Sequence, residues 1–181
     1  MKKILKNIVK SLVVVAMIIS YVSINVRAIE TNDDIPNVAL NKLTIASNGN
    51  SSRAVDGNKT SYWDGGLYPS ELLVDLDGFY DVSKIVVIPY YNGSRYYNYE
   101  VYTSVDGFNY EKVGEKTDKT LQTVNGETYT FETKVTRYVK VKMTYNSANT
   151  SVHINELEVY GVENLDYELP EISYGDPNDP D

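Results

Sequence analysis

The chain has 181 residues, 42% of them hydrophobic, and its 25 acidic against 17 basic residues give a net charge of −8. It contains no cysteine, which excludes disulfide scaffolds and cysteine-ligated zinc or iron–sulfur sites. Its single histidine, His153, excludes any centre that needs two imidazoles. Because nucleic-acid phosphates require a basic surface, we expect no nucleic-acid partner.

Segment 1–28 has the pattern of a secretory signal peptide. Four lysines and an apolar run over 12–19 precede Val26-Arg27-Ala28, which offers a small-residue cleavage site. The alternative, a retained membrane anchor, is less favoured because a bilayer needs about 20 apolar residues. We therefore predict export to the exterior of a bacterial cell. Cleavage would leave 12 basic against 25 acidic residues, a net charge of −13.

Residues 29–161 are enough for one domain that buries about two-thirds of its unfolded surface. The following segment, 162–181, changes in composition, with seven acidic residues, three prolines and no basic residue. This composition predicts a solvated linker or tail. It either ends freely or leads into a further module, for which a catalytic module is one candidate.

Inside the domain the pattern is that of strands and turns, without a helical period. Short β-rich runs occupy 71–76 and 83–89, and the dipeptide Asp77-Gly78 predicts a turn between them. A second turn dipeptide, Asp106-Gly107, predicts a hairpin between 98–104 and 108–113. Further strands are expected at 128–131, 137–143 and 153–160. Many short strands without crossover helices predict an all-β, antiparallel sandwich.

A candidate cation loop lies early in the domain. Asp56, Asn58 and Thr60 offer side-chain oxygens at alternate positions around a glycine, and calcium takes six to eight such oxygen ligands. The spacing is not that of an EF-hand, because Ser61 and Leu67 stand where Gly and Glu are required. On this local pattern, a turn capped by Asp and Asn side chains is the alternative.

Several short motifs then follow one another in a characteristic order. They are NVALNK at 37–42, AVDGN at 54–58 with Thr60 and Trp63, VDL at 74–76, YEVY at 99–102 with Asp106-Gly107, RYVKV at 137–141 and INELEVYG at 154–161. Together they resemble the coagulation factor 5/8 type C (discoidin) family, and the nearest branch is carbohydrate-binding module family 32. The resemblance covers residues 37–161.

This resemblance implies a discoidin-type jelly roll with a structural calcium ion. It assigns to that ion Glu156, in the terminal motif, about a hundred residues after the first loop. Such a link closes a long loop, and in principle a cross-link stabilises a fold most when the loop it closes is long. The implied metal ligands are Ala54, through its backbone oxygen, Asp56, Asn58, Thr60 and Glu156.

Residues 90–95, between two predicted strands, are rich in side chains that suit a sugar. A sugar ring has an apolar C–H face and a rim of hydroxyls, so aromatic rings beside amide or guanidinium groups can hold it. A second polar loop, 145–153, lies beside the binding rim in the family. The candidate carbohydrate-binding residues are Tyr90, Tyr91, Asn92, Arg95, Tyr96, Tyr145 and Asn146. The alternative for Arg95 is a pair with an acidic neighbour, whereas Tyr97 and Trp63 are expected in the core and His153 as a structural hydrogen-bonding residue.

The sequence departs from galactose-binding members of the family at two positions. Those members usually carry a His in the loop that matches 47–53 and an Arg directly after the proline that matches Pro89. This chain has no His in that loop, and Tyr90 follows Pro89. The identity of the sugar is therefore open, with galactose- and N-acetylhexosamine-containing glycans among the candidates.

We predict a secreted, non-catalytic carbohydrate-binding module that attaches an exported protein to glycans. The alternative is a discoidin-like protein-interaction or spacer module that binds no sugar. No enzyme is expected, because no Ser–His–Asp, Cys–His or phosphate-binding glycine pattern is present. No membrane lipid partner is expected either, because anionic headgroups repel an acidic domain.

Overall fold

The computed structural model of the chain describes residues 35–169, so the predicted signal segment 1–28 and most of the acidic tail lie outside the described residues. Apart from one short 3₁₀ turn, the regular structure of this part is entirely β. Among the described residues, no helix has the length and hydropathy to cross a membrane. The elements are β1 (Leu43–Ala46), η1 (Ser51–Ala54), β2 (Trp63–Leu67), β3 (Ser70–Pro89), β4 (Tyr97–Ser104), β5 (Glu111–Lys116), β6 (Glu127–Asn146) and β7 (Ser151–Glu163).

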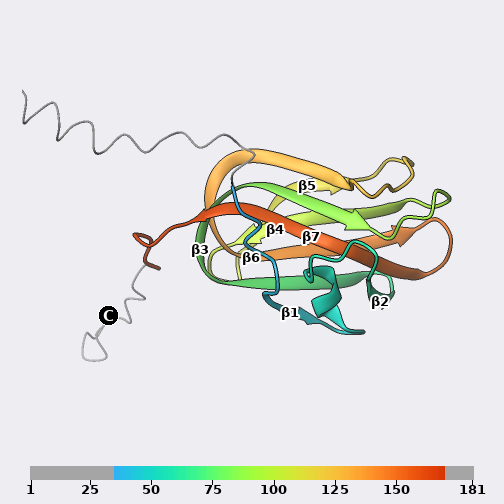
Figure 1. Ribbon diagram of the computed structural model, residues 1–181, viewed down its shortest axis with the longest axis horizontal. Coiled ribbons are helices and arrows are strands. Elements are labelled where there is room, and N and C mark those ends of the chain that lie inside the picture. Colours follow the sequence, from blue (N-terminus) through green and yellow to red (C-terminus); the bar gives the residue numbers. More distant parts are fainter. Residues whose placement is uncertain (1–34, 170–181) are drawn as a thin grey trace, which may run out of the picture. The chain divides into compact units, whose positions relative to one another are not determined.

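All strand pairs are antiparallel, in the order β2-β7-β3-β6-β4-β5 with β1 also paired to β3. The first part of β3 pairs with β1 and with the end of β6, which in turn pairs with β4. The second part of β3 pairs with β7 and with the beginning of β6. The two 20-residue strands, β3 and β6, thus serve both layers, and Figure 1 shows them curving round one end of the domain. The predicted antiparallel sandwich is confirmed.

The predicted break at Asp77-Gly78 is wrong, because β3 runs through it without a turn. Asp77 has a φ of 57°, and its N–H donates to Asp75 Oδ1 at 2.9 Å. The register with β6 shifts between Asp75 and Tyr80, as it does at a β-bulge, which bends a strand and increases its twist. The expected runs 128–131 and 137–143 are likewise parts of one strand, β6.

One hydrophobic core fills the space between the layers. Leu72, Val74 and Leu76 alternate along β3 and are fully buried, as a strand with one face in a core requires. Trp63 and Tyr97 are also fully buried, which confirms that they belong to the core. The predicted hairpin is confirmed too, since β4 pairs with β5 across the turn that contains Asp106.

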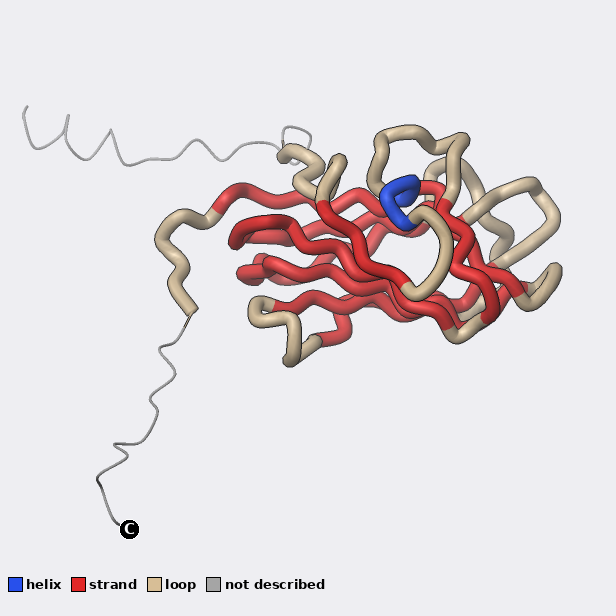
Figure 2. Tube along the Cα trace, turned by 90° about the horizontal axis from the view of Figure 1, so that it is seen from below, coloured by secondary structure: helices blue, strands red, loops and turns tan. Residues whose placement is uncertain are grey.

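Three connections meet at one end of the strands, namely β2–β3, β3–β4 and β6–β7. The β3–β4 loop is tied to the β6–β7 turn by the N–H of Ser147, which donates to Tyr96 O at 3.0 Å. The β2–β3 connection joins the same turn through Tyr68 N–H and Thr150 O at 3.1 Å. Figure 2 shows the larger loops gathered at this end. Side chains far apart in the sequence are therefore brought together there.

Candidate functional site

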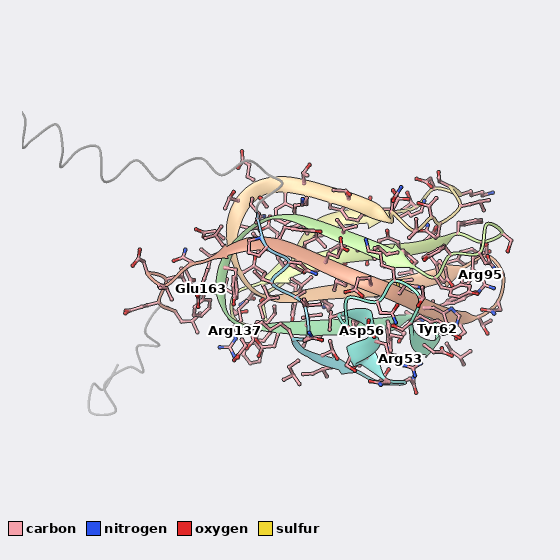
Figure 3. The ribbon with its side chains drawn as sticks, viewed as in Figure 1. Arg53, Asp56, Tyr62, Arg95, Arg137 and Glu163 are labelled. Carbon is pink, nitrogen blue, oxygen red and sulfur yellow. The ribbon has the colours of Figure 1, made fainter. Side chains whose placement is uncertain are left out.

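A small pocket opens among these loops. Its volume is about 160 Å³, and its lining residues are Tyr62, Tyr90, Arg95, Asn149 and His153. They come from the segment before β2, the β3–β4 loop, the β6–β7 turn and β7. Figure 3 shows Tyr62 and Arg95 at the same end of the domain. The pocket therefore depends on the packing of three separate loops against β7.

Aromatic rings form one wall of the pocket. The Tyr62 ring meets Tyr90 edge to face, with ring centroids 5.2 Å apart, and meets His153 in the same way at 5.4 Å. The backbone N–H of Tyr90 donates to His153 O at 3.3 Å, which ties the loop to β7. Because offset and edge-to-face pairs are favourable, the three rings hold one another in place. Tyr62 is 37% exposed, so this wall is open to a ligand.

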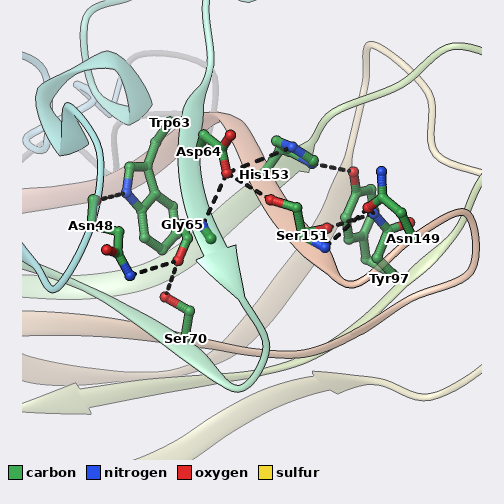
Figure 4. A network of polar contacts seen from close by, with 11 residues as sticks. Asn48, Trp63, Asp64, Gly65, Ser70, Tyr97, Asn149, Ser151 and His153 are labelled. Carbon is green, nitrogen blue, oxygen red and sulfur yellow. Dashed lines mark hydrogen bonds and ion pairs between the residues drawn. The ribbon is translucent and has the colours of Figure 1, made fainter.

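A polar chain continues from His153 into the core (Figure 4). His153 Nδ1 shares a hydrogen bond with the Tyr97 hydroxyl at 2.9 Å, and its Nε2 lies 3.8 Å from Asp64 Oδ1. Burial lowers the pKa of His153, although the Asp64 charge opposes this, so the imidazole is neutral at pH 7. Burial raises the pKa of Tyr97, although the Arg95 charge opposes this. The prediction that His153 is a structural hydrogen-bonding residue is confirmed, and the ring also lines the pocket.

Asp64 is held as an anion beside this chain. Its Oδ1 accepts hydrogen bonds from Ser151 Oγ at 2.7 Å and from Gly66 N–H at 3.0 Å. These hydrogen bonds lower its pKa, with a smaller contribution from His153. Asp64 therefore braces β2 against β7.

Arg95 supplies the formal positive charge of the pocket. Its guanidinium carbon lies 4.9 Å from the centre of the Tyr90 ring, a cation–π distance. Its Nε is buried and has no hydrogen-bond partner among the described residues. The alternative prediction is an ion pair between Arg95 and an acidic neighbour. Among residues 35–169 no such pair is found, because every ion pair there involves a cation other than Arg95.

Two of the seven predicted sugar-binding residues, Tyr90 and Arg95, line this pocket. Tyr96 and Tyr145 instead lie in a second aromatic row, in which Tyr145 contacts Tyr96 and Tyr68 with ring centroids 5.7 Å apart in each pair. The row borders the same loops, but its members are not in the pocket lining.

The other three predicted residues have local structural contacts. Tyr91 donates its hydroxyl proton to Lys59 O at 3.1 Å. Asn92 is exposed, and its Oδ1 caps its own turn by accepting from Ser94 N–H and Oγ–H. Asn146 is 2% exposed and donates to Asn149 Oδ1 and Ser151 O. These contacts hold the loops that shape the pocket.

The residues that sequence reasoning missed are Tyr62 and Asn149. Asn149 lies within the polar loop that the sequence singled out, where nothing distinguishes it from the neighbouring asparagine. Tyr62 directly precedes β2 and the buried Trp63, and it is 37% exposed. No pattern in the sequence distinguishes it as a lining residue.

The candidate cation loop meets β7 as expected. Glu156 is 1% exposed, and its Oε1 accepts from Gly57 N–H at 3.2 Å, across 99 positions of sequence. Its Oε2 is buried without a hydrogen-bond partner among residues 35–169. Burial, with smaller contributions from Asp56 and Glu158, raises the pKa of Glu156 to about 7. The nearby cation Lys59 is paired with Glu158 at 2.9 Å, so the Glu156 carboxylate is short of positive charge.

Within the loop, three of the other predicted ligands, Asp56, Asn58 and Thr60, are joined by hydrogen bonds, and Ala54 is buried beside them in the chain. Asp56 accepts from Asn58 N–H at 2.8 Å and from Ser61 Oγ at 2.8 Å. Asn58 Oδ1 accepts from Thr60 N–H and Oγ–H at 3.0 and 2.7 Å. These are the capped turns that the local pattern offered as the alternative, and they hold exposed oxygens close to Glu156. Within the described part of the chain, no cluster of three or more His, Cys, Asp or Glu side chains could hold a metal, so a cation here would need neutral oxygens as well.

A sequence model of the F5/8 type C domain family matches residues 35–157. The chain belongs to this family. No curated protein matches it. The assignment to the family therefore rests on the match to the sequence model. Solved structures that resemble the chain share its fold.

Three solved structures illustrate that likeness to this F5/8 type C domain. A family 89 glycoside hydrolase from Clostridium perfringens has 26% identity and a TM-score of 0.64 over 76% of this chain, but only 16% of that enzyme is covered. Chitosan-binding module 1 of a chitosanase/glucanase from Paenibacillus sp. IK-5 has 27% identity and a TM-score of 0.57, over 69% of this chain and 98% of that module. The family 32 carbohydrate-binding module of AlyQ has 23% identity and a TM-score of 0.59, over 65% of this chain and 93% of that module.

The matches differ in how much of each solved structure they cover. The F5/8 type C domain spans about a sixth of the glycoside hydrolase but nearly all of the two binding modules. The domain thus has the fold of these binding modules, and the F5/8 type C family that the motif order predicted is confirmed.

Proposed function

We propose that this F5/8 type C domain is a secreted, non-catalytic carbohydrate-binding module that attaches an exported protein to glycans. The observation that carries the proposal is the pocket of Tyr62, Tyr90, Arg95, Asn149 and His153. It combines aromatic rings with an amide and a guanidinium group, which suit the apolar face and the polar rim of a sugar ring. The solved chitosan-binding module with the same fold supports this proposal.

The size of the pocket favours a short ligand. At about 160 Å³ it is smaller than the roughly 300–1,000 Å³ typical of drug-sized ligands, so it suits one sugar ring at the end of a chain. Tyr62 and Tyr90 would pack on the C–H face of that ring, and Asn149 and Arg95 would bond to its polar rim. Galactose- and N-acetylhexosamine-containing glycans are candidates.

We also propose that the Asp56 loop and Glu156 hold a structural calcium ion. The support is the chemistry of the oxygens: a buried carboxylate with an unbonded oxygen, short of positive charge, beside a loop of exposed oxygens. Glu156 and Asp56 would supply the charged ligands, and Asn58, Thr60 and the backbone oxygen of Ala54 the neutral ones. When bound, the ion would neutralise Glu156 and fix the first loop to β7. Chelation should therefore lower the melting temperature.

Export and attachment to a longer parent protein complete the proposal. The support is the charge and apolar pattern of 1–28 and the acidic, proline-containing composition of 162–181. A catalytic module elsewhere in such a parent would act on the glycan that this domain holds nearby.

A glycan array with the purified protein tests the proposed function. We expect binding to a defined set of glycans, and we expect Tyr90→Ala to abolish it while Tyr110→Ala, at a tyrosine outside the pocket, leaves it unchanged. Both variants should unfold cooperatively, which a thermal melt checks. If a broad array of plant, bacterial and animal glycans gives no signal above that of the Tyr90→Ala variant, the protein-interaction or spacer alternative is favoured instead.

A further inference from the structure

The charge of Arg95 is the feature of the pocket that a neutral sugar leaves unexplained. Elsewhere in the domain, the partly buried Arg137 bonds to both oxygens of Asp75, at 3.0 and 3.1 Å. Arg95 is also partly buried, yet no carboxylate oxygen of the described residues lies within 4.0 Å of it. The two arginines therefore differ in that only Arg137 is paired with a carboxylate of the described residues.

The other groups that line the pocket do not balance this charge. Two tyrosines, Asn149 and a neutral His153 complete the lining. The carboxylate beside the pocket, Asp64, is not a lining residue, and its Oδ1 is occupied by Ser151 Oγ and Gly66 N–H. Arg95 is thus the one formally charged side chain of the lining, in a chain whose net charge is −8, and the Asp64 anion lies outside the lining.

A partly buried guanidinium without a counter-charge is unfavourable by itself. Removing a charged group from water costs free energy unless an opposite charge or hydrogen bonds compensate. The cation–π contact with the Tyr90 ring, 4.9 Å from the guanidinium carbon, compensates in part. Nε remains sealed from water and unbonded. The described residues provide no carboxylate at ion-pair distance, so the charge of Arg95 is left for a ligand to balance.

Building on the proposed function, we propose that the pocket selects an anionic sugar, and that Arg95 binds a carboxylate of the uronic acid class. The planar guanidinium presents N–H donors in a fork that matches the two oxygens of a carboxylate. The sugar ring would pack against Tyr62 and Tyr90 with its carboxylate toward Arg95. The ligand then supplies the missing counter-charge, and the tyrosines supply the apolar contact.

The test compares sugars that differ in charge at one position. The purified protein is titrated by calorimetry with methyl glycosides of galacturonic, glucuronic and mannuronic acid, and with the corresponding galactose, glucose and mannose glycosides. We expect at least one acid to bind about tenfold or more tightly than its neutral counterpart, a difference of about 1.4 kcal/mol. This preference should shrink as salt is raised, because salt screens the ion pair.

Three variants locate the effect. Arg95→Gln should abolish the preference for the acid while leaving the melting temperature within a few degrees, and Arg95→Lys should retain part of it, because the charge remains without the fork. Arg53→Gln removes the same charge from an exposed position outside the pocket and should change nothing. An undiminished preference in Arg95→Gln would overturn the assignment of Arg95.

The remaining outcomes separate this inference from the proposed function. If neutral sugars bind as tightly as the acids, the anionic specificity is wrong while glycan binding stands. If a galactose sulfate binds and no uronate does, the carboxylate assignment is wrong. If neither charged nor neutral sugars bind and the array is also blank, both the inference and the proposed function fail.

Discussion

The substitution Glu156→Gln tests the proposed calcium site, because it should change stability in opposite directions with and without the ion. Glutamine keeps an oxygen that can accept from Gly57 N–H but removes the buried charge. A ligand that binds only the folded state adds about 2.7 kcal/mol at one hundred times its dissociation constant. For a domain of this size that corresponds to a rise in melting temperature of roughly 10 °C. The wild-type protein should show this rise in calcium, and the variant should not.

In excess chelator the order of the two melting temperatures should reverse, with the variant above the wild type. The folded pKa of Glu156 is raised from its ordinary 4.5 to about 7, so the folded state disfavours the ionised form. The contribution of Glu156 to the stability of the fold therefore falls as the pH rises from about 4.5 through 7. At about 1.4 kcal/mol per pKa unit, ionising Glu156 costs up to roughly 3 kcal/mol at pH 8. The amide avoids this cost. Glu156→Gln should therefore melt at a higher temperature than the wild type in chelator at pH 8.

Differential scanning calorimetry at pH 8, with calcium or with excess chelator, measures both effects. Glu158→Gln, two residues along β7, is the matched control and should keep the calcium-dependent rise, because Glu158 is already paired with Lys59. An equal rise in calcium for Glu156→Gln and wild type would refute the proposed ligand set. A wild-type melt that is unchanged by chelation would refute the site altogether.

Three further predictions concern the pocket and the fold. Tyr62→Ala should weaken glycan binding by roughly tenfold or more, as truncation of a central aromatic contact does. Tyr145→Ala, in the second aromatic row, should not weaken it. A glycan array or calorimetry compares the affinities of the two variants. Asp75→Asn should reduce stability by about 1 kcal/mol at pH 7. Burial opposes ionisation of Asp75, but hydrogen bonds from its arginine partner and from Asp77 N–H outweigh burial and lower the pKa of Asp75. The contribution of the ionised Asp75 to stability is therefore lost as the pH falls below about 4. Urea titrations of wild type and variant at pH 7 and 3 would contradict this if the difference in their stability did not shrink at pH 3. Gly126→Ala should destabilise more than Gly93→Ala, because both have positive φ but only the first places a Cβ against a backbone oxygen, Val87 O; equal midpoints in urea would show that this close approach is relaxed.

Much of the fold could be predicted because β-strand patterns are local. Alternation placed Val139, Val141 and Met143 on one face, and all three are buried. The continuity of β3 could not be predicted in this way. Asp-Gly is favoured both in tight turns and in bulges, since both use a positive φ, and only the pairing with β6 distinguishes them.

The candidate site was harder to predict, because its lining depends on how loops close over one another. The sequence marked the β3–β4 loop correctly, and Tyr90 and Arg95 do line the pocket. It could not show that Tyr91 turns to Lys59 or that Asn146 is buried within its own turn. The contact between Glu156 and Gly57 followed from the family resemblance, since no local pattern connects residues 99 positions apart.

The central claim is that sugar binds in the pocket formed by Tyr62, Tyr90, Arg95, Asn149 and His153. The most direct measurement is an NMR titration of the isotope-labelled protein with a glycan that the array identifies. The account predicts that saturable changes in amide and aromatic shifts concentrate on these five residues and their immediate neighbours. Changes confined to another surface, such as the outer face of β5, with the pocket signals unmoved, would contradict it.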